Sequence, residues 1–503
     1  MKKRNLVFSL LSGVILALAL PKPGWWFMSW FGLAPLVIGL KRSTAKQAVW
    51  LGFACGFVYF GMICRWLTIF GYLPWCLVAI KEAIWLAIFS ASASYLLRYE
   101  MRARTYLVIA AVWTIIQWAR TLGPFGFTWG SFAHTQANVL PIVQLGAITG
   151  PWGVEFLVCV TNIALAELVL EARQRENRKK IAKRVTLVGA LIALSLVYGH
   201  TQLAKPISTG RDSFKVAIIQ GSLTHDVNPK PEYVVEAYTI YDAMTRAAAI
   251  YEPDLIVWPE TTIVDCITGE TWGPLIAELA RDTRSNMIVG GYDYSGDAAG
   301  RNYNAAHFFD RQGRKIGVYH KVHLVPYGEY VPLRKQMPWL KRYGIREVDI
   351  LPGKMHVVVK TELGKVGTAI CFESIFPGIL SQSVRNGANF LVVLTNDAWF
   401  KHSDAAQQHL MMAQLRAAET HRYVVRAAAT GISAIIDPHG RIRSELGIFR
   451  QGIVRGNVVS LNEKTPYVRY GDWFVYACFA GVAILVRMVK KGERKQFRRT
   501  YTC

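Results

Sequence analysis

Three polar residues stand in motifs whose residue types can act together on a carbonyl group. Glu260 lies in WPET, Lys321 in YHKVHLVPYGEYVP and Cys371 in GKVGTAICFES. A cysteine that attacks a carbonyl carbon needs a base to take its proton, and a desolvated carboxylate can do this. The tetrahedral intermediate then needs fixed positive charge near its oxyanion, which a lysine can supply. The three residue types therefore predict nucleophilic attack by the cysteine.

Each of these residues also has a simpler interpretation. A glutamate or lysine in a loop is usually solvated, and a small residue at the end of a buried strand is usually part of the core. The functional interpretation depends on the combination, because all three follow segments with the composition of strands. A cysteine on a strand-to-helix turn is exposed, and nearby backbone N–H groups can stabilise a thiolate and an oxyanion.

The elements that must position these residues alternate between strands and helices after residue 213. The expected strands are residues 215–220, 255–258, 287–290, 305–309, 315–319, 366–370, 390–394, 433–436 and 453–458. The expected helices are residues 232–251, 271–284, 377–386 and 406–429. This alternation, with fully apolar strands, predicts an α/β layered core.

The composition of the whole chain indicates a membrane protein. Of the 503 residues, 52% are hydrophobic and 18% are charged, and the net charge is +24, whereas a soluble domain carries about 25% charged residues. Apolar segments predict about eight α-helical spans, at residues 5–20, 25–40, 49–70, 73–97, 106–119, 152–170, 185–203 and 473–489. We therefore expect three parts: a transmembrane bundle of about seven spans (1–204), a catalytic domain (205–471), and a transmembrane helix with a basic tail (472–503).

The distribution of charge predicts the orientation of these parts. Residues 205–471 carry 31 Lys+Arg and 26 Asp+Glu, so most of the excess positive charge belongs to the spans, their loops and the tail. Basic loops mark the cytoplasmic side of a membrane protein, which places both termini inside and residues 205–471 outside. The nearly balanced outer domain removes most of the case for a nucleic-acid partner.

The cysteines and histidines predict no metal site or other cofactor. Of the eight cysteines, only Cys266 and Cys371 lie in the expected outer domain, and neither has CxxC or Cys/His spacing. His320 and His323 flank the lysine motif but have no third ligand nearby in the sequence.

The ordered motifs WPE, HK followed by a GE loop, and CFE resemble those of the carbon–nitrogen hydrolase (nitrilase) superfamily. The resemblance covers about residues 214–459. It implies an α-β-β-α sandwich in which Glu260 is the base, Lys321 stabilises the oxyanion and Cys371 is the acylated nucleophile.

The whole chain is similar to the apolipoprotein N-acyltransferase family, with LTNDAWF and ATGISAIIDPHG as further shared motifs. The resemblance implies that Cys371 takes an acyl chain from a phospholipid, expected to be phosphatidylethanolamine, as a thioester. The α-amino group of a diacylglyceryl-cysteine lipoprotein then receives the chain, in the last step of lipoprotein maturation. The expected location is the bacterial inner membrane, with the catalytic domain of a monomer in the periplasm. The alternative is a membrane-tethered amidase of the nitrilase type that hydrolyses a small amide.

Four further residues have expected roles at the site. The resemblance implies that Glu329 orients Lys321 or the attacking amine, and that Phe372 offers its backbone N–H to the oxyanion. Glu373 would fix the turn after the cysteine or provide a proton path. Trp399, in an expected loop near the site, either packs in the core or contacts an acyl chain.

Some residues depart from the family pattern or leave two interpretations open. Phe372 stands where related enzymes usually have tyrosine, and Lys401 stands where glycine is common. Charged residues in or near the apolar segments are either structural or functional; these are Arg65, Lys81, Glu82, Glu155 and Glu167.

Overall fold

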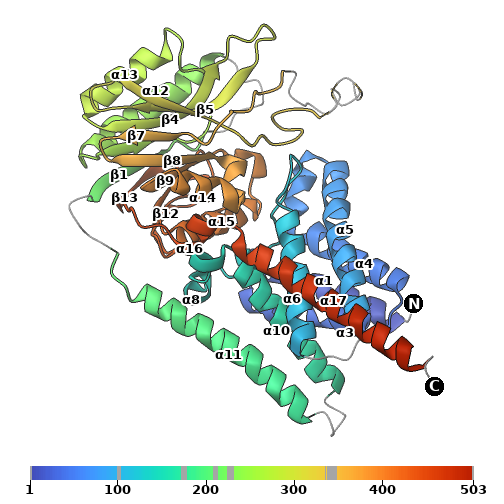
Figure 1. Cartoon of the computed structure of the whole chain (residues 1–503). Coiled ribbons are helices and arrows are strands. Elements are labelled where there is room, and N and C mark those ends of the chain that lie inside the picture. The colour runs from blue at the N-terminus through green and yellow to red at the C-terminus, as the bar shows by residue number, and fades with distance from the viewer. Residues whose placement is uncertain are drawn as a thin grey trace. The chain divides into compact units, whose positions relative to one another are not determined.

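A computed structural model describes residues 3–98, 103–171, 178–207, 213–223, 231–332, 334, 336 and 348–500 (Figure 1). The chain divides into two compact units. The helical unit comprises Met1–Leu122, Phe127–Gln202 and Asp472–Cys503, and the α/β unit comprises Gly123–Gly126 and Leu203–Gly471. Each unit is described by itself.

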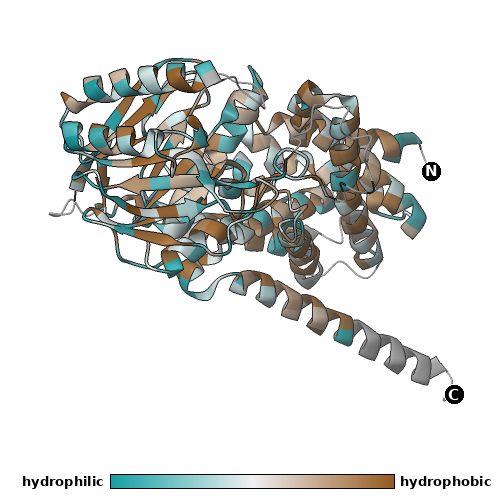
Figure 2. Cartoon of the chain, turned by 90° about the horizontal axis from the view of Figure 1, so that it is seen from above, coloured by the Kyte–Doolittle hydropathy of each residue, from teal (hydrophilic) through white to brown (hydrophobic). Residues whose placement is uncertain are grey.

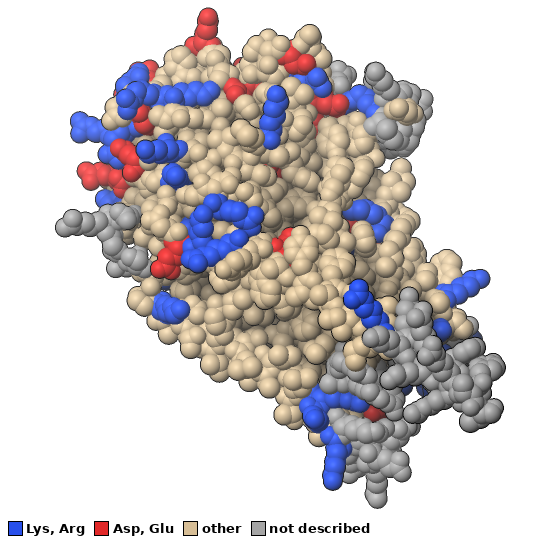
Figure 3. All heavy atoms as spheres, in the orientation of Figure 1, with Lys and Arg blue, Asp and Glu red and all other residues tan. Residues whose placement is uncertain are grey.

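The helical unit is built from apolar helices (Figure 2). They are α1 (Lys3–Leu18), α2 (Ser29–Gly32), α3 (Ala34–Leu40), α4 (Ala45–Ile63), α5 (Tyr72–Leu96), α6 (Ala103–Ala119), α7 (Phe132–Thr135), α8 (Leu140–Val143), α9 (Gly146–Thr149), α10 (Trp152–Glu171), α11 (Arg178–Leu203) and α17 (Trp473–Thr500). Uncharged side chains cover most of its face in Figure 3, whereas charges of both signs are spread over the α/β unit.

Four helices in the described part of the chain are long and apolar enough to cross a membrane: Ala45–Ile63, Tyr72–Leu96, Trp152–Glu171 and Ile181–Leu203. The expected count of about eight is not confirmed. The segment expected at residues 25–40 is divided between a 3₁₀ turn and the short helices α2 and α3. The apolar helices Thr105–Ala119 and Trp473–Met488 are shorter than the four. The apolar composition predicted the segments. A segment is long enough to cross a membrane only if its helix is unbroken over that length.

The α/β unit contains two sheets: one is formed by the first six strands and the last strand, β13, and the other by the strands between them. The first has the order β13-β1-β2-β4-β5-β6, with β3 also paired to β4, and the second has the order β12-β11-β10-β9-β8-β7. The first-sheet strands are β1 (Ser213–Gln220), β2 (Leu255–Val257), β3 (Ile263–Cys266), β4 (Asn286–Tyr294), β5 (Asn302–Phe309), β6 (Lys315–His320) and β13 (Gly452–Val459). The second-sheet strands are β7 (Val358–Thr361), β8 (Gly364–Ile370), β9 (Phe390–Thr395), β10 (Val424–Ala428), β11 (Ser433–Ile436) and β12 (Ile442–Leu446).

The buried side chains define four layers, α-β-β-α. One core cluster joins inward side chains of both sheets, such as Val216 and Ile218 with Val392 and Val425, so the sheets pack face to face. A second cluster joins the first sheet to α12 (Pro231–Ala249) and α13 (Trp272–Thr283), and a third joins the second sheet to α14 (Pro377–Arg385) and α15 (Ala405–Thr420). The expected α/β layered core is therefore confirmed.

One expected element is wrong in its second half. The helix expected at residues 406–429 ends at Thr420, because His421 adopts the left-handed conformation with φ 52°. The chain then enters β10, which pairs in parallel with β9. Alanine-rich composition had favoured a continuous helix, but the β-branched pair Val424 and Val425 fills both faces of the strand: Val425 lies in the core between the sheets, and Val424 packs against α14 and α15.

The strand directions place the three candidate residues at one end of the sandwich. β1, β2 and β4 pair in parallel, and β6 runs in the same direction as β4 because both are antiparallel to β5. In the second sheet, β8, β9 and β10 are parallel. The residues that follow β2, β6 and β8 therefore come from the carboxyl ends of strands in both sheets.

Candidate active site

Glu260 follows β2 and is almost completely buried. Its Oε1 accepts hydrogen bonds from Asn304 Nδ2 at 2.8 Å and from Lys321 Nζ at 3.2 Å. Its Oε2 accepts from the backbone N–H of Asn396 at 2.8 Å. This carboxylate is thus held in one orientation from both sheets, since Asn304 lies on β5 and Asn396 follows β9.

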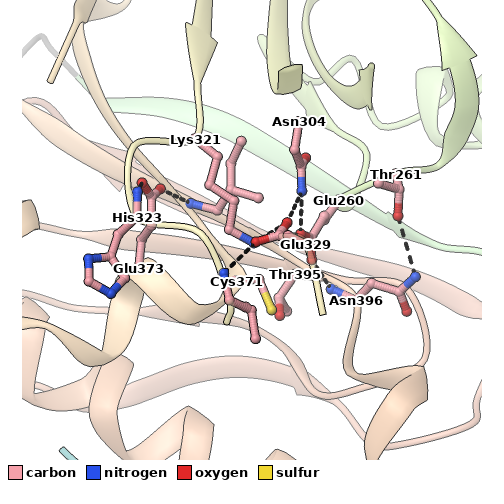
Figure 4. Close-up of polar contacts among 12 residues, drawn as sticks. Glu260, Thr261, Asn304, Lys321, His323, Glu329, Cys371, Glu373, Thr395 and Asn396 are labelled. Carbon is pink, nitrogen blue, oxygen red and sulfur yellow. Dashed lines mark hydrogen bonds and ion pairs between the residues drawn. The ribbon is translucent and has the colours of Figure 1, made fainter. Parts of the chain in front are cut away.

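Lys321 follows β6, and its ammonium group lies between two carboxylates (Figure 4). Besides Glu260, it donates to Glu329 Oε1 at 2.9 Å. Burial by itself would lower the pKa of Lys321, but the negative charges of Glu260 and Glu329 outweigh burial and hold that pKa well above its ordinary value. The amine is therefore a permanent cation in this site.

Cys371 follows β8 and begins the 3₁₀ helix Cys371–Ile375. Its backbone is left-handed, with φ 52°, a conformation that costs a non-glycine residue about 1–3 kcal/mol. Burial raises the pKa of the thiol, and the charge of Glu260 raises it further, while Lys321 opposes both effects. The resting residue is consequently a neutral thiol, and it needs a base to become a nucleophile.

Asn304 links the two carboxylates beside Lys321 and was not identified from the sequence. Its side-chain Nδ2 donates to Glu260 at 2.8 Å and to Glu329 at 2.9 Å. Its backbone carbonyl oxygen accepts from the backbone N–H of Lys321 at 2.9 Å. Glu329 Oε2 also accepts from the N–H of Val325 at 2.8 Å, which closes the loop that carries both residues. The only sequence signal was a polar side chain on an otherwise buried strand.

Glu373 is fully buried and connects the two sheets near the site. It accepts hydrogen bonds from Tyr319 Oη on β6, from the N–H groups of Val322 and His323, and from the N–H of Ile370. Burial raises the pKa of this carboxyl group to about 7, although the N–H donors counteract part of that effect. The position agrees with a carboxylate that fixes the turn after Cys371.

The two aromatic candidates have different surroundings. Phe372 lies in a ring cluster with Phe376, at 5.3 Å between centroids, and with His323, at 5.8 Å. In Figure 4 the ring of His323 points away from the sulfur of Cys371. Trp399 lies in the 3₁₀ helix Asp397–Phe400 and is 37% exposed, so it is not a core residue.

Among the described residues, no group of three or more His, Cys, Asp or Glu side chains is arranged to hold a metal ion. The arrangement of Glu260, Lys321 and Cys371 combines a fixed carboxylate, a fixed cation and a thiol, which are the groups that acyl transfer through a covalent intermediate uses.

The charged residues of the helical unit have mostly structural surroundings. Glu82 is buried and lies 2.8 Å from Lys81 Nζ and 2.7 Å from Arg120 Nε. Glu155, also buried, accepts hydrogen bonds from Trp113 Nε1 at 2.8 Å, from the N–H of Ala133 at 3.0 Å and from Ser131 Oγ.

The remaining two of the charged residues that the sequence left open lie in different surroundings. Glu167 pairs with Arg184, whereas Arg65 is exposed in a 3₁₀ helix. Glu82, Glu155 and Glu167 are buried, and each has ion-pair or hydrogen-bond partners. These surroundings support the structural interpretation of the three residues.

Two family models match the chain in separate regions. Residues 215–463 match the carbon-nitrogen hydrolases, and residues 12–164 match the N-terminal domain of apolipoprotein N-acyltransferases. The NitFhit protein of C. elegans is a similar solved structure, with 19% identity, a TM-score of 0.41, and coverage of 52% of this chain and 63% of that chain.

Relatives are similar over nearly the full length. An apolipoprotein N-acyltransferase of Geobacter metallireducens is 34% identical over 97% of this chain and 95% of its own length. One of Gloeobacter violaceus is 31% identical over 92% of this chain and 90% of its own length. The resemblance expected from the motifs is confirmed: the chain belongs to the apolipoprotein N-acyltransferase family.

Proposed function

We propose that this protein moves an acyl chain from a membrane phospholipid to the N-terminal amine of a lipoprotein, with Cys371 as the carrier. The observation that carries the proposal is the Lys321 ammonium held between Glu260 and Glu329 beside a buried thiol. Membership in the family supports the identity of donor and acceptor. The apolar helices support a site that receives two lipid-bearing substrates at a membrane.

In the first step, Glu260 takes the thiol proton while the Cys371 sulfur attacks an ester carbonyl of the phospholipid. The oxyanion that forms is stabilised by the Lys321 ammonium and by the backbone N–H of Phe372. The ester C–O bond then breaks, and the proton on Glu260 passes to the departing glyceryl oxygen. The products are a lysophospholipid and an acyl thioester on Cys371.

In the second step, the neutral α-amino group of the diacylglyceryl-cysteine attacks the thioester. A carboxylate of the site takes a proton from the nitrogen and passes it to the departing sulfur as the C–S bond breaks, so that the thiol is restored. Glu329 is suited to orient the amine because it lies beside Lys321 and is less deeply buried than Glu260. Exclusion of water when the lipid substrates bind would favour the amine over water as acceptor.

Several finer features belong to the same proposal. We expect phosphatidylethanolamine as donor, a monomeric protein, and about eight spans across the inner membrane with both termini in the cytoplasm. Residues 1–204 would form the first part of the bundle, residues 205–471 would face the periplasm, and residues 472–503 would form the last span and tail. The basic loops support this orientation.

Mass spectrometry of a lipoprotein N-terminus in cells depleted of the wild-type protein tests the proposal. Cys371→Ala and Glu260→Ala variants should remain in the membrane but leave the lipoprotein diacylated. Triacylated lipoprotein in the Cys371→Ala cells would exclude this mechanism. With purified protein and phospholipid, an acyl-Cys371 species that turns over only after addition of diacylated lipopeptide indicates transfer, whereas rapid release of free fatty acid indicates hydrolysis.

A further inference from the structure

A buried polar cluster lies next to Cys371 and takes no part in the steps proposed above. Its members Thr395, Asp397, His409 and Arg426 are each no more than 2% exposed. Asp397 is at the centre. Its Oδ1 accepts from the Thr395 hydroxyl at 2.9 Å and lies 3.0 Å from His409 Nδ1, and its Oδ2 accepts from Arg426 Nη2 at 2.8 Å.

Thr395 lies beside the side chain of Cys371 and is hydrogen-bonded to Asp397. Its hydroxyl donates to Asp397 Oδ1 at 2.9 Å. In Figure 4 the sulfur of Cys371 lies beside Thr395. The bond to Asp397 thus fixes a side chain that borders the thiol.

The cluster is connected to the backbone of Cys371 through His409. Nε2 of His409 lies 3.2 Å from the carbonyl oxygen of Cys371 and 2.8 Å from Ser374 Oγ. A carbonyl oxygen only accepts, so Nε2 carries the hydrogen in the first contact, and Nδ1 accepts from Arg426 Nη2 at 3.1 Å. Arg426 in turn donates to Asp397 Oδ2 at 2.8 Å. The Ser374 hydroxyl donates to the same carbonyl oxygen at 2.8 Å.

The left-handed backbone of Cys371 needs such support. A residue at φ 52° keeps that conformation only where its surroundings impose it. Here the carbonyl oxygen is held by His409 and Ser374. The main chain of the nucleophile is thus fixed by the buried cluster and by the turn that follows it.

Asp397 is suited to this task because it is ionised. Burial raises the pKa of its carboxyl group, but Arg426 and His409 outweigh burial and lower that pKa to about 2. The packing beside Asp397 also leaves no room for a side chain at Gly431. A Cβ atom added at Gly431, between β10 and β11, would lie 2.2 Å from Asp397 Oδ2.

We propose that Asp397 and His409 are positioning residues for acylation: they hold the left-handed turn at Cys371 so that its thiol faces Glu260 and Lys321. The inference rests on the proposed function, in which Cys371 carries the acyl chain. It assigns a role to two residues of the segment 395–409, outside the Glu260, Lys321 and Cys371 set.

The test measures how fast purified full-length variants acquire an acyl group on Cys371 from phosphatidylethanolamine micelles, by intact-protein mass, without acceptor. His409→Leu should slow acylation about 100-fold, since a small displacement of a reacting atom has an effect of this order. His409→Gln should recover most of the loss, because its amide can donate to the Cys371 carbonyl. The kcat/KM for lipopeptide, which depends only on the second step, should stay within about twofold in both when it is measured with acceptor.

Two glycine substitutions, one at the site and one as a control, provide an independent measurement if His409→Leu fails to fold. Gly431→Ala should displace Asp397 and slow acylation by at least tenfold, as Asp397→Asn should. Gly378→Ala is the matched control, because a Cβ atom there meets nothing within 4 Å, and it should acylate like the wild type.

The outcomes separate this inference from the proposed function. A folded His409→Leu variant that acylates Cys371 at the wild-type rate would overturn the positioning role, as would Gly431→Ala with an unchanged rate. Equal losses in His409→Leu and His409→Gln would also count against it. Continued N-acylation of lipoprotein by Cys371→Ala would instead contradict the proposed function.

Discussion

Each unit contains a buried ion cluster, and the two clusters have opposite composition. In the helical unit one carboxylate, Glu82, lies between the cations Lys81 and Arg120. In the α/β unit one cation, Lys321, lies between the carboxylates Glu260 and Glu329. The ion-pair distances in the two clusters are similar, although the net charge of the first cluster is positive and that of the second is negative.

The clusters also differ in how their hydrogen-bond donors are used. Each of the three guanidinium nitrogens of Arg120 donates a hydrogen bond within the fold: to Glu82, to Gln117 Oε1 and to the carbonyl oxygen of Trp129. The ammonium of Lys321 has three N–H groups, and the described side chains Glu260 and Glu329 accept from two of them. A buried cation whose nitrogens all bind the fold stabilises the structure, whereas the third N–H of Lys321 can bind a transient negative charge.

The largest expected effect breaks the second cluster. Lys321→Met should lower the rate of Cys371 acylation at least about 1000-fold, because the oxyanion loses its fixed cation. Single-turnover acylation by phospholipid measures this. Lys321→Arg is the matched control: it keeps the charge but replaces a compact ammonium with a planar guanidinium, so it should recover only part of the rate. Acylation within tenfold of wild type in Lys321→Met would contradict the assignment.

Breaking the first cluster should instead affect stability. Arg120→Met leaves Glu82 buried with only a partly exposed lysine as partner and should destabilise the protein by about 3–5 kcal/mol. Thermal unfolding in detergent measures the change, and kcat per folded molecule should remain near wild type. Arg246→Met provides the control, because its pairs with Asp242 and Asp282 are exposed and should contribute less than about 1 kcal/mol. A kcat loss without destabilisation in Arg120→Met would show that this cluster, too, is functional.

A smaller effect tests how the second cluster is held together. Asn304→Leu removes one donor shared by Glu260 and Glu329, and hydrogen bonds to charged groups contribute about 1.5–3 kcal/mol. Acylation should therefore slow about 10- to 100-fold while the protein stays folded. Steady-state kcat and the unfolding midpoint distinguish the two effects. An unchanged kcat would mean that Lys321 alone orients both carboxylates.

The smallest expected effect concerns Asp293, a buried carboxylate that pairs with His320 and Lys315 outside both clusters. Burial raises the pKa of Asp293, but His320, Thr268, His307 and Lys315 outweigh it and lower that pKa to about 2. A lowered pKa contributes stability that is fully present above the ordinary value of 3.8 and is lost as the pH falls toward 2.

Asp293→Asn should therefore reduce stability at pH 7 by at most about 2 kcal/mol. The difference from wild type should shrink as the pH is lowered from 5 to 3. Unfolding midpoints across this range check the prediction, and a difference that is constant with pH would attribute the loss to packing rather than charge.

The motifs at the strand ends made much of this site predictable. Glu260, Lys321 and Cys371 were identified because apolar strands end in the polar residue types that acyl transfer requires, and the role of Glu329 was implied by the family resemblance. The alternation of strands and helices was likewise sufficient to predict a layered α/β core. These features are local, since hydrophobic periodicity and residue type are visible within windows of about ten residues.

Other features depended on which segments pair in space. The short strand β10 was mistaken for helix because its place between β9 and β11, not its alanine-rich composition, selects the extended conformation. The positions of Asn304 and His409 beside the site follow from sheet pairing and helix packing across many residues of sequence. The length of an unbroken helix, which separates four candidate spans from shorter apolar segments, is similarly settled by turns that hydropathy does not detect.

By itself, the sequence determined the chemistry that this protein can perform, because the reactivity of a thiol, an amine or a carboxylate belongs to the residue type. Only the tertiary structure decided which groups hold those residues in place. Asn304 bridges two carboxylates, and Asp397 and His409 hold the Cys371 turn, through contacts between strands and helices far apart in the chain. Hydrogen bonds act over about 3 Å, so such partners become identifiable only once the chain has folded.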